Sequence, residues 1–149
     1  MYRENFPKLT DDNFEVTSPY TWDYNCIAWT FGESRTWWSP APGGYYWPRG
    51  LPKNARDVSN LVKLYVMHGF EVCEDGSTAL AVGFEKVALY TAWGGEWRHA
   101  ALQRPDGKWT SKLAEHEDIV HDTAEDLLGG EYLAIAFVLR RQLQKLPPV

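Results

Sequence analysis

The chain has 149 residues, of which 44% are hydrophobic and 15% are aromatic, and its formal net charge is −5. This length is typical of one domain with a substantial core, and we predict a single domain over residues 1–149. The acidic balance argues against nucleic acid and against anionic membranes as partners. No run of the sequence approaches the roughly 18 apolar residues that a membrane span requires.

The chain contains two cysteines, Cys26 and Cys73. Two are too few for a disulfide framework, and their spacing matches no metal motif. We therefore expect two reduced thiols and no metal or other cofactor. The first residues lack the apolar core of a signal peptide. The protein is expected in the cytoplasm, or outside it by a route that needs no signal peptide.

Residues 1–22 contain prolines and little periodicity, which predicts an extended N-terminal arm or a short strand. We expect this arm to pack on the core through its apolar side chains, which are Phe6, Leu9, Phe14 and Val16. A first helix is predicted to start near Asp23 or Tyr24. Asp23 is a suitable N-cap, and Gly32 is a suitable stop.

Residues 33–56 form a segment rich in proline, glycine and aromatic residues, which excludes a long helix or strand. A long aromatic loop in a compact domain is commonly a binding loop or a lid. Its rings can also serve as a hydrophobic cover of the core. We predict that this loop walls a substrate cleft, with Trp38 or Trp47 partly exposed there.

A second helix is predicted over residues 57–69, where apolar residues recur at helical spacing before a glycine. Strands are predicted at 70–73, 85–91, 98–103, 108–113 and 131–139, with a short helix at 122–129. The turn at 104–107 is a hairpin signal. The pattern predicts an α+β fold, with a cysteine-bearing helix packed on an antiparallel sheet of about four to six strands.

Cys26 lies at the start of the first predicted helix, where the helix dipole and free backbone N–H groups favour a thiolate. A nucleophilic cysteine needs a histidine that meets it in space. His99, which opens a predicted strand, is the best candidate. The alternative interpretation is that Cys26 is a small buried residue and that His99 only ends a strand.

The other histidines, His68, His116 and His121, are interpreted as surface residues. A metal site built from His116 and His121 with Glu117 and Asp118 matches no strong motif, so none is expected.

The order of these parts resembles papain-like cysteine hydrolases of the NlpC/P60 type. Three segments carry the resemblance: Asn25-Cys26, where that family usually has Asp-Cys; the strand Gly83–Tyr90; and His99–Gln103 leading to Trp109-Thr110-Ser111. The chain also resembles a bacterial family without an established activity that carries YNCIAW, HAA and WTSKL motifs, here Tyr24–Trp29, His99–Ala101 and Trp109–Leu113.

The resemblance implies a papain-like fold in which Cys26 is the nucleophile, His99 the general base and Ser111 the residue that orients the imidazole. Depending on strand register, Thr110 or Lys112 takes the place of Ser111 opposite His99. A hydroxyl orients less strongly than a carboxylate because it carries no charge. Asn25 or Tyr24 is a candidate to form an oxyanion site with the Cys26 backbone N–H.

The predicted activity is that of a cysteine hydrolase or acyltransferase acting on an amide bond: a peptidase, amidase or deamidase. The expected partner is a peptide or amide substrate, such as a protein, a cell-wall stem peptide or a glutamine side chain. The alternative is a non-catalytic protein- or ligand-binding module of the same fold that uses the aromatic loop as its contact surface.

Overall fold

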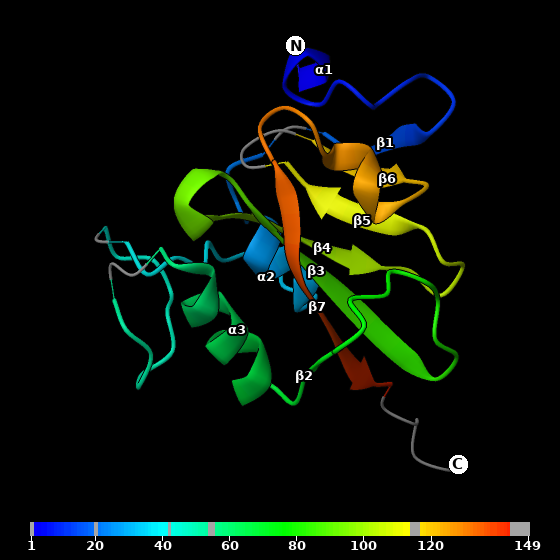
Figure 1. The fold of residues 1–149 in the computed structure, drawn as a ribbon. Coiled ribbons are helices and arrows are strands. Elements are labelled where there is room, and N and C mark those ends of the chain that lie inside the picture. Colours follow the sequence, from blue (N-terminus) through cyan, green and yellow to red (C-terminus); the bar gives the residue numbers. More distant parts are fainter. Residues whose placement is uncertain (1, 20, 42, 54–55, 114–116, 144–149) are drawn as a thin grey trace, which may run out of the picture.

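The computed structural model describes residues 2–19, 21–41, 43–53, 56–113 and 117–143, and it confirms the α+β class (Figure 1). A seven-stranded sheet has the order β1-β6-β5-β4-β3-β7-β2, and its strand pairs are antiparallel. The strands are β1 Phe14–Ser18, β2 Glu71–Val72, β3 Phe84–Thr91, β4 Trp97–Gln103, β5 Trp109–Lys112, β6 Asp118–His121 and β7 Ala134–Gln142. The α-helices are α1 Tyr2–Asn5, α2 Cys26–Thr30 and α3 Val58–Met67, and two short 3₁₀-helices are η1 Trp93–Gly95 and η2 Ala124–Leu127.

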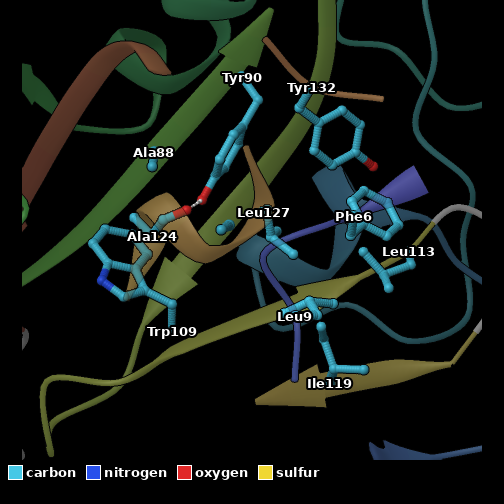
Figure 2. Packing of buried hydrophobic residues seen from close by; sticks show 11 residues of the cluster. Phe6, Leu9, Ala88, Tyr90, Trp109, Leu113, Ile119, Ala124, Leu127 and Tyr132 are labelled. Carbon is cyan, nitrogen blue, oxygen red and sulfur yellow. Dashed lines mark hydrogen bonds between the residues drawn. The ribbon is translucent and has the colours of Figure 1, made fainter. Parts of the chain in front are cut away.

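The two faces of the sheet bury two different apolar clusters, because successive strand residues point to opposite faces. On one face α2 and α3 pack against Val87, Leu89 and Ala100. On the other face the N-terminal arm and η2 pack against Tyr90, Ala101 and other residues of the sheet (Figure 2). The sheet is therefore the middle layer that holds the cysteine-bearing helix against β4.

The second predicted helix is confirmed as α3. Asp57 is its N-cap and accepts a hydrogen bond from Ser59 N at 3.2 Å. Gly69 follows the helix with a φ of +91°, a conformation that glycine adopts without strain. The first helix is shorter than predicted, because α2 begins at Cys26 and its N-cap is Asn25 instead of Asp23.

The N-terminal arm is partly as predicted. Phe6 and Leu9 are buried in the core, whereas Val16 is 45% exposed. Val16 lies on β1, the edge strand that pairs with β6, so its side chain is not covered by a second layer. The strand β6 was not predicted, because four residues among charged neighbours give too short a pattern.

Within its described residues 33–41, 43–53 and 56, the aromatic segment forms no strand. These described residues contain a single β-bridge, between Trp38 and Tyr46.

The hairpin at 104–107 is confirmed by the hydrogen bond from Arg104 N to Lys108 O at 2.7 Å. The last strand runs three residues further than predicted, to Gln142, because Arg141 is anchored there by Glu85 and by the carbonyl of His68.

Gly130 tests the docking of the arm. A Cβ at Gly130 would lie 2.2 Å from the carbonyl oxygen of Asn5, while Glu131 N donates to that same oxygen at 2.8 Å. Gly130 is the one glycine without a positive φ among those described. Because alanine restricts the unfolded chain more than glycine does, Gly130→Ala would raise the free energy of unfolding by about 0.4–1 kcal/mol if the arm were not there. We expect it instead to destabilise by about 1–3 kcal/mol through the clash. Urea unfolding measures the difference, and a stabilised variant would contradict the docked arm.

Candidate functional site

Cys26 and His99 line one cavity of about 320 Å³ between the start of α2, the aromatic loop and β4. The cavity lies near the start of β4, where Trp97 and Arg98 also line it, and Tyr132 and Trp37 contribute to its wall. The fold therefore brings the predicted nucleophile and the predicted base to the same hollow, although they come from distant parts of the sequence.

Asn25 fixes the position of α2 beside the aromatic loop. Its Oδ1 accepts hydrogen bonds from Ala28 N at 3.2 Å and from Trp38 N at 3.1 Å, and its Nδ2 donates to Trp38 O at 2.6 Å. The same side chain thus caps the helix and ties down the loop that forms one wall. One amide hydrogen of Asn25 remains for a ligand in the cavity, which Asn25 also lines.

His99 is held by a line of buried hydrogen bonds across three neighbouring strands. Its Nε2 lies 2.9 Å from Ser111 Oγ on β5, and Ser111 Oγ lies 2.8 Å from Nε2 of His121 on β6. The other ring nitrogen of His121, Nδ1, lies 2.8 Å from the carbonyl oxygen of Thr123. The exposed fractions of His99, Ser111 and His121 are all 0%.

The carbonyl of Thr123 decides where the protons of this line lie. A carbonyl only accepts, so His121 Nδ1 carries the proton, and Nε2 of a neutral His121 accepts from the Ser111 hydroxyl. Ser111 then accepts from His99 Nε2, which leaves the lone pair on His99 Nδ1. That nitrogen is buried and has no hydrogen-bond partner among the described residues. Neutral His99 therefore carries its proton on Nε2 and its lone pair on Nδ1.

Burial holds the Cys26 thiol and the His99 imidazole in their neutral forms. It lowers the pKa of His99 to about 3, with the charge of His121 adding to the effect, and it also lowers the pKa of His121. Burial raises the pKa of Cys26 to about 11 against the opposing effect of backbone N–H groups, chiefly that of Ala100. This is opposite to the lowered pKa expected from the helix start. The helix has only five residues, and its dipole does not outweigh desolvation.

Two residues of the site were missed in the sequence. His121 was interpreted as a surface residue, but it is completely buried and completes the line of hydrogen bonds. Tyr132 stacks on His99 with ring centroids 4.9 Å apart and an angle of 7° between the rings. Figure 2 shows Tyr132 beside Phe6 and Tyr90 in the core of that face. The available signal was the run 118–121: if it is taken as a strand, His121 lies on the same face as the apolar Ile119, which predicts that His121 is buried.

The remaining candidates on β5 have other partners. The Thr110 hydroxyl accepts from Trp29 Nε1 at 3.2 Å, and Lys112 Nζ donates to Thr21 O at 3.0 Å. Both side chains lie on the opposite face of β5 from Ser111. Ser111 is thus the residue of the three that reaches His99.

Tyr24 is also outside the cavity wall, since its hydroxyl donates to Asp118 Oδ2 and its ring stacks on Trp29. In the aromatic loop, Trp38 stacks on Phe31 and Trp47 packs against the same apolar cluster. Trp37, instead of Trp38 or Trp47, lines the cavity that holds Cys26.

Within the described ranges, no three histidine, cysteine or acidic side chains gather where they could hold a metal ion. His116 lies outside the described residues. The described helices are also too short and too polar for any of them to cross a membrane.

A family model described as a domain of unknown function, DUF7689, matches residues 15–140, and the chain belongs to this family. No curated protein and no solved structure matches the chain.

The neutral resting pair can be tested by the ultraviolet absorbance of the thiolate. The difference in absorbance between the protein and its Cys26→Ser variant isolates Cys26 from Cys73 and from the tyrosines. Because burial raises the pKa of Cys26 to about 11, we expect no thiolate signal at pH 7 and a rise only near pH 11. A full thiolate signal between pH 6 and 8 would show a resting ion pair and contradict this reading.

The buried His99 also predicts how stability depends on pH. Its pKa of about 3 in the folded protein lies below the ordinary histidine value of 6.5, so the unfolded chain binds more protons between these two values. The contribution of neutral His99 to the free energy of unfolding is complete above about pH 6.5. It is lost as the pH falls toward 3, with a slope of up to about 1.4 kcal/mol per pH unit. Urea unfolding at pH 7, 6 and 5 should show a smaller loss for His99→Gln than for the unchanged protein. Equal losses would refute a neutral buried imidazole.

Proposed function

We propose that this member of the DUF7689 family is a cysteine hydrolase or acyltransferase that cleaves an amide bond, with Cys26 as nucleophile and His99 as general base. The observation that carries the proposal is the free lone pair on Nδ1 of His99, a residue that lines the same cavity as Cys26. A buried imidazole whose role is only structural has no reason to keep one nitrogen unpaired, since an unsatisfied buried polar atom costs about 1–3 kcal/mol.

The chemistry follows from the neutral pair. As the Cys26 sulfur attacks the carbonyl carbon of the amide, its proton passes to His99 Nδ1, and an imidazolium forms. The tetrahedral oxyanion needs donors, and the free amide hydrogen of Asn25 and the Cys26 backbone N–H are the candidates. The imidazolium then gives its proton to the leaving amine, which leaves a thioester on Cys26. Water or another acceptor, deprotonated by His99, then attacks the thioester carbon, and the Cys26 sulfur leaves and takes this proton back from the imidazolium.

Ser111 orients His99 more strongly than an isolated hydroxyl would, because its own hydroxyl donates to His121. When His99 becomes positively charged, its Nε2–H bond to Ser111 strengthens, and the Ser111 hydroxyl is polarised by His121 Nε2. His121 in turn is held by the Thr123 carbonyl, and Thr123 is fixed by its capping box with Asp126. These residues position the base without touching the substrate.

The arrangement of the chain supports a papain-like fold of the NlpC/P60 type. The cysteine begins a helix that packs on β4 and β5, the histidine lies on β4, and the orienting residue lies on β5. In this proposal the substrate is a peptide or a small amide, and the protein works in the cytoplasm or after export without a signal peptide.

One observation favours the second candidate function, a binding module that uses the aromatic loop. Tyr45 and Tyr46 are 47% and 45% exposed, and Trp22, which stacks on Trp37, is 61% exposed. These rings lie next to the cavity wall formed by Trp37, so they also suit the binding of a substrate chain.

Alkylation by iodoacetamide distinguishes the two functions, with peptide mass spectrometry following Cys26 and Cys73 separately. A general base contributes about 10²–10⁴-fold, so His99→Gln should slow the alkylation of Cys26 by about 100-fold or more. Ser111→Ala and His121→Phe should slow it less, by about 10-fold, because these residues only orient the base.

The rate at Cys73 is the internal control and should be the same in every variant, with circular dichroism verifying the fold. If His99→Gln leaves the rate at Cys26 unchanged, the two residues are not a catalytic pair, and the binding function is favoured.

A further inference from the structure

The charged side chains that line the cavity, among the residues described, are two arginines, Arg56 and Arg98. The other lining residues are neutral at pH 7, and no described acidic side chain is among them. This is notable because the whole chain has a net charge of −5. An excess of positive charge at one cavity of an acidic protein indicates that this cavity suits an anionic ligand.

The arginines are only weakly neutralised by their neighbours. Arg56 Nη1 lies 3.5 Å and Arg98 Nη1 lies 3.9 Å from the same oxygen, Oε1 of Glu96. Both distances exceed the roughly 2.7–2.9 Å of a charge-assisted hydrogen bond. One carboxylate therefore faces two guanidinium groups, and most of their N–H donors stay available to a ligand.

Arg98 is also close to the reacting groups. It precedes His99 directly near the start of β4, and both residues line the cavity. Burial raises the pKa of the Tyr132 hydroxyl, the charge of Cys26 adds to this, and the positive charge of Arg98 opposes it. Tyr132 in turn stacks on the His99 ring.

We propose that the cavity selects amides that carry a free carboxylate close to the scissile bond, with Arg98 and Arg56 as the residues that bind this carboxylate. The inference rests on the proposed function, and it adds the substrate class. A guanidinium presents paired donors that match the two oxygens of a carboxylate. A cavity of about 320 Å³ is at the lower end for ligand pockets, so it admits one or two residues of a substrate. A terminal amino acid joined through its amide nitrogen has these properties.

A matched pair of reagents tests the proposal directly at Cys26. Iodoacetate and iodoacetamide both alkylate sulfur with loss of iodide, and they differ by the carboxylate that iodoacetate carries. We expect the iodoacetate-to-iodoacetamide rate ratio at Cys26 to exceed the ratio for the same cysteine in the urea-unfolded protein.

Removing one arginine should lower this ratio about five-fold, as a single nearby charge in a solvated site would. The variants are Arg98→Gln and Arg56→Gln, with Arg98→Lys retaining the charge and part of the effect. Arg104→Gln is the matched control, because Arg104 pairs with Asp106 at 3.0 Å in the turn at the other end of β4. It should leave the ratio unchanged, as should all variants at Cys73.

Binding of small ligands to the Cys26→Ala variant tests the same idea without any chemistry at Cys26. N-acetylglycine carries the carboxylate and N-acetylglycinamide does not, and the shifts of backbone NMR signals around Arg98 report binding of either. We expect N-acetylglycine to bind more tightly than N-acetylglycinamide, and Arg98→Gln to abolish the difference.

The outcomes separate the two proposals. Alkylation by iodoacetamide that depends on His99, but with no preference for iodoacetate and equal binding of the two ligands, would overturn the carboxylate site and leave the cysteine–histidine pair. Alkylation at a rate that His99→Gln leaves unchanged, together with selective binding of N-acetylglycine, would keep the carboxylate site and overturn the proposed hydrolase.

Discussion

The line of hydrogen bonds from His99 through Ser111 and His121 to the carbonyl of Thr123 is the constraint on which the site depends. His99, Ser111 and His121 are completely buried, and the carbonyl at the end of the line fixes the direction in which each of the hydrogen bonds donates. The backbone pairing of β4 with β5 ends at Leu102 and Thr110, and these side chains carry the connection between the strands beyond that point. The same bonds therefore hold the sheet together and decide which nitrogen of His99 is basic.

Burial gives the site its second property, which is a neutral thiol beside a neutral imidazole. A buried ion pair would have to offset the desolvation of two charges, and the short α2 helix contributes too little to do so. In the proposed mechanism the proton moves during attack, when the developing charge on the substrate stabilises the imidazolium. Arg56 and Arg98 line the cavity, and in the proposal their positive charges bind an anionic substrate, whose charge in turn favours the imidazolium.

Much of the architecture could be predicted from local patterns. Val58, Leu61 and Tyr65 recur at helical spacing and define α3, while the alternation around Ala88 and Tyr90 and the turn at Asp106-Gly107 define the strands beside it. The pattern did not reveal β6, because Ile119 and Val120 are too short a run to be recognised without their neighbours β1 and β5. Missing that strand meant missing His121, whose role exists only through its partners on other strands.

Within the site, the pairing of Cys26 with His99 in one cavity could be anticipated from residue types, but the lining of the cavity could not. Trp37, Tyr132 and Arg56 come from a loop and from segments that follow turns, and no periodicity places them. The pKa of Cys26 was misjudged for a related reason. Its position at a helix start is a local property, whereas its burial is set by the packing of α2 on the sheet.

The central claim is that His99 is a base at Nδ1, and ¹⁵N NMR of the histidine rings tests it most directly. The signals of His99 and His121 are assigned by comparison with His99→Gln and His121→Gln. At pH 7 the account predicts that His99 carries its proton on Nε2 and has an unprotonated Nδ1, while His121 carries its proton on Nδ1. A proton on His99 Nδ1 at this pH would mean that the bonds through Ser111 run in the opposite direction, and it would contradict the proposed role of His99.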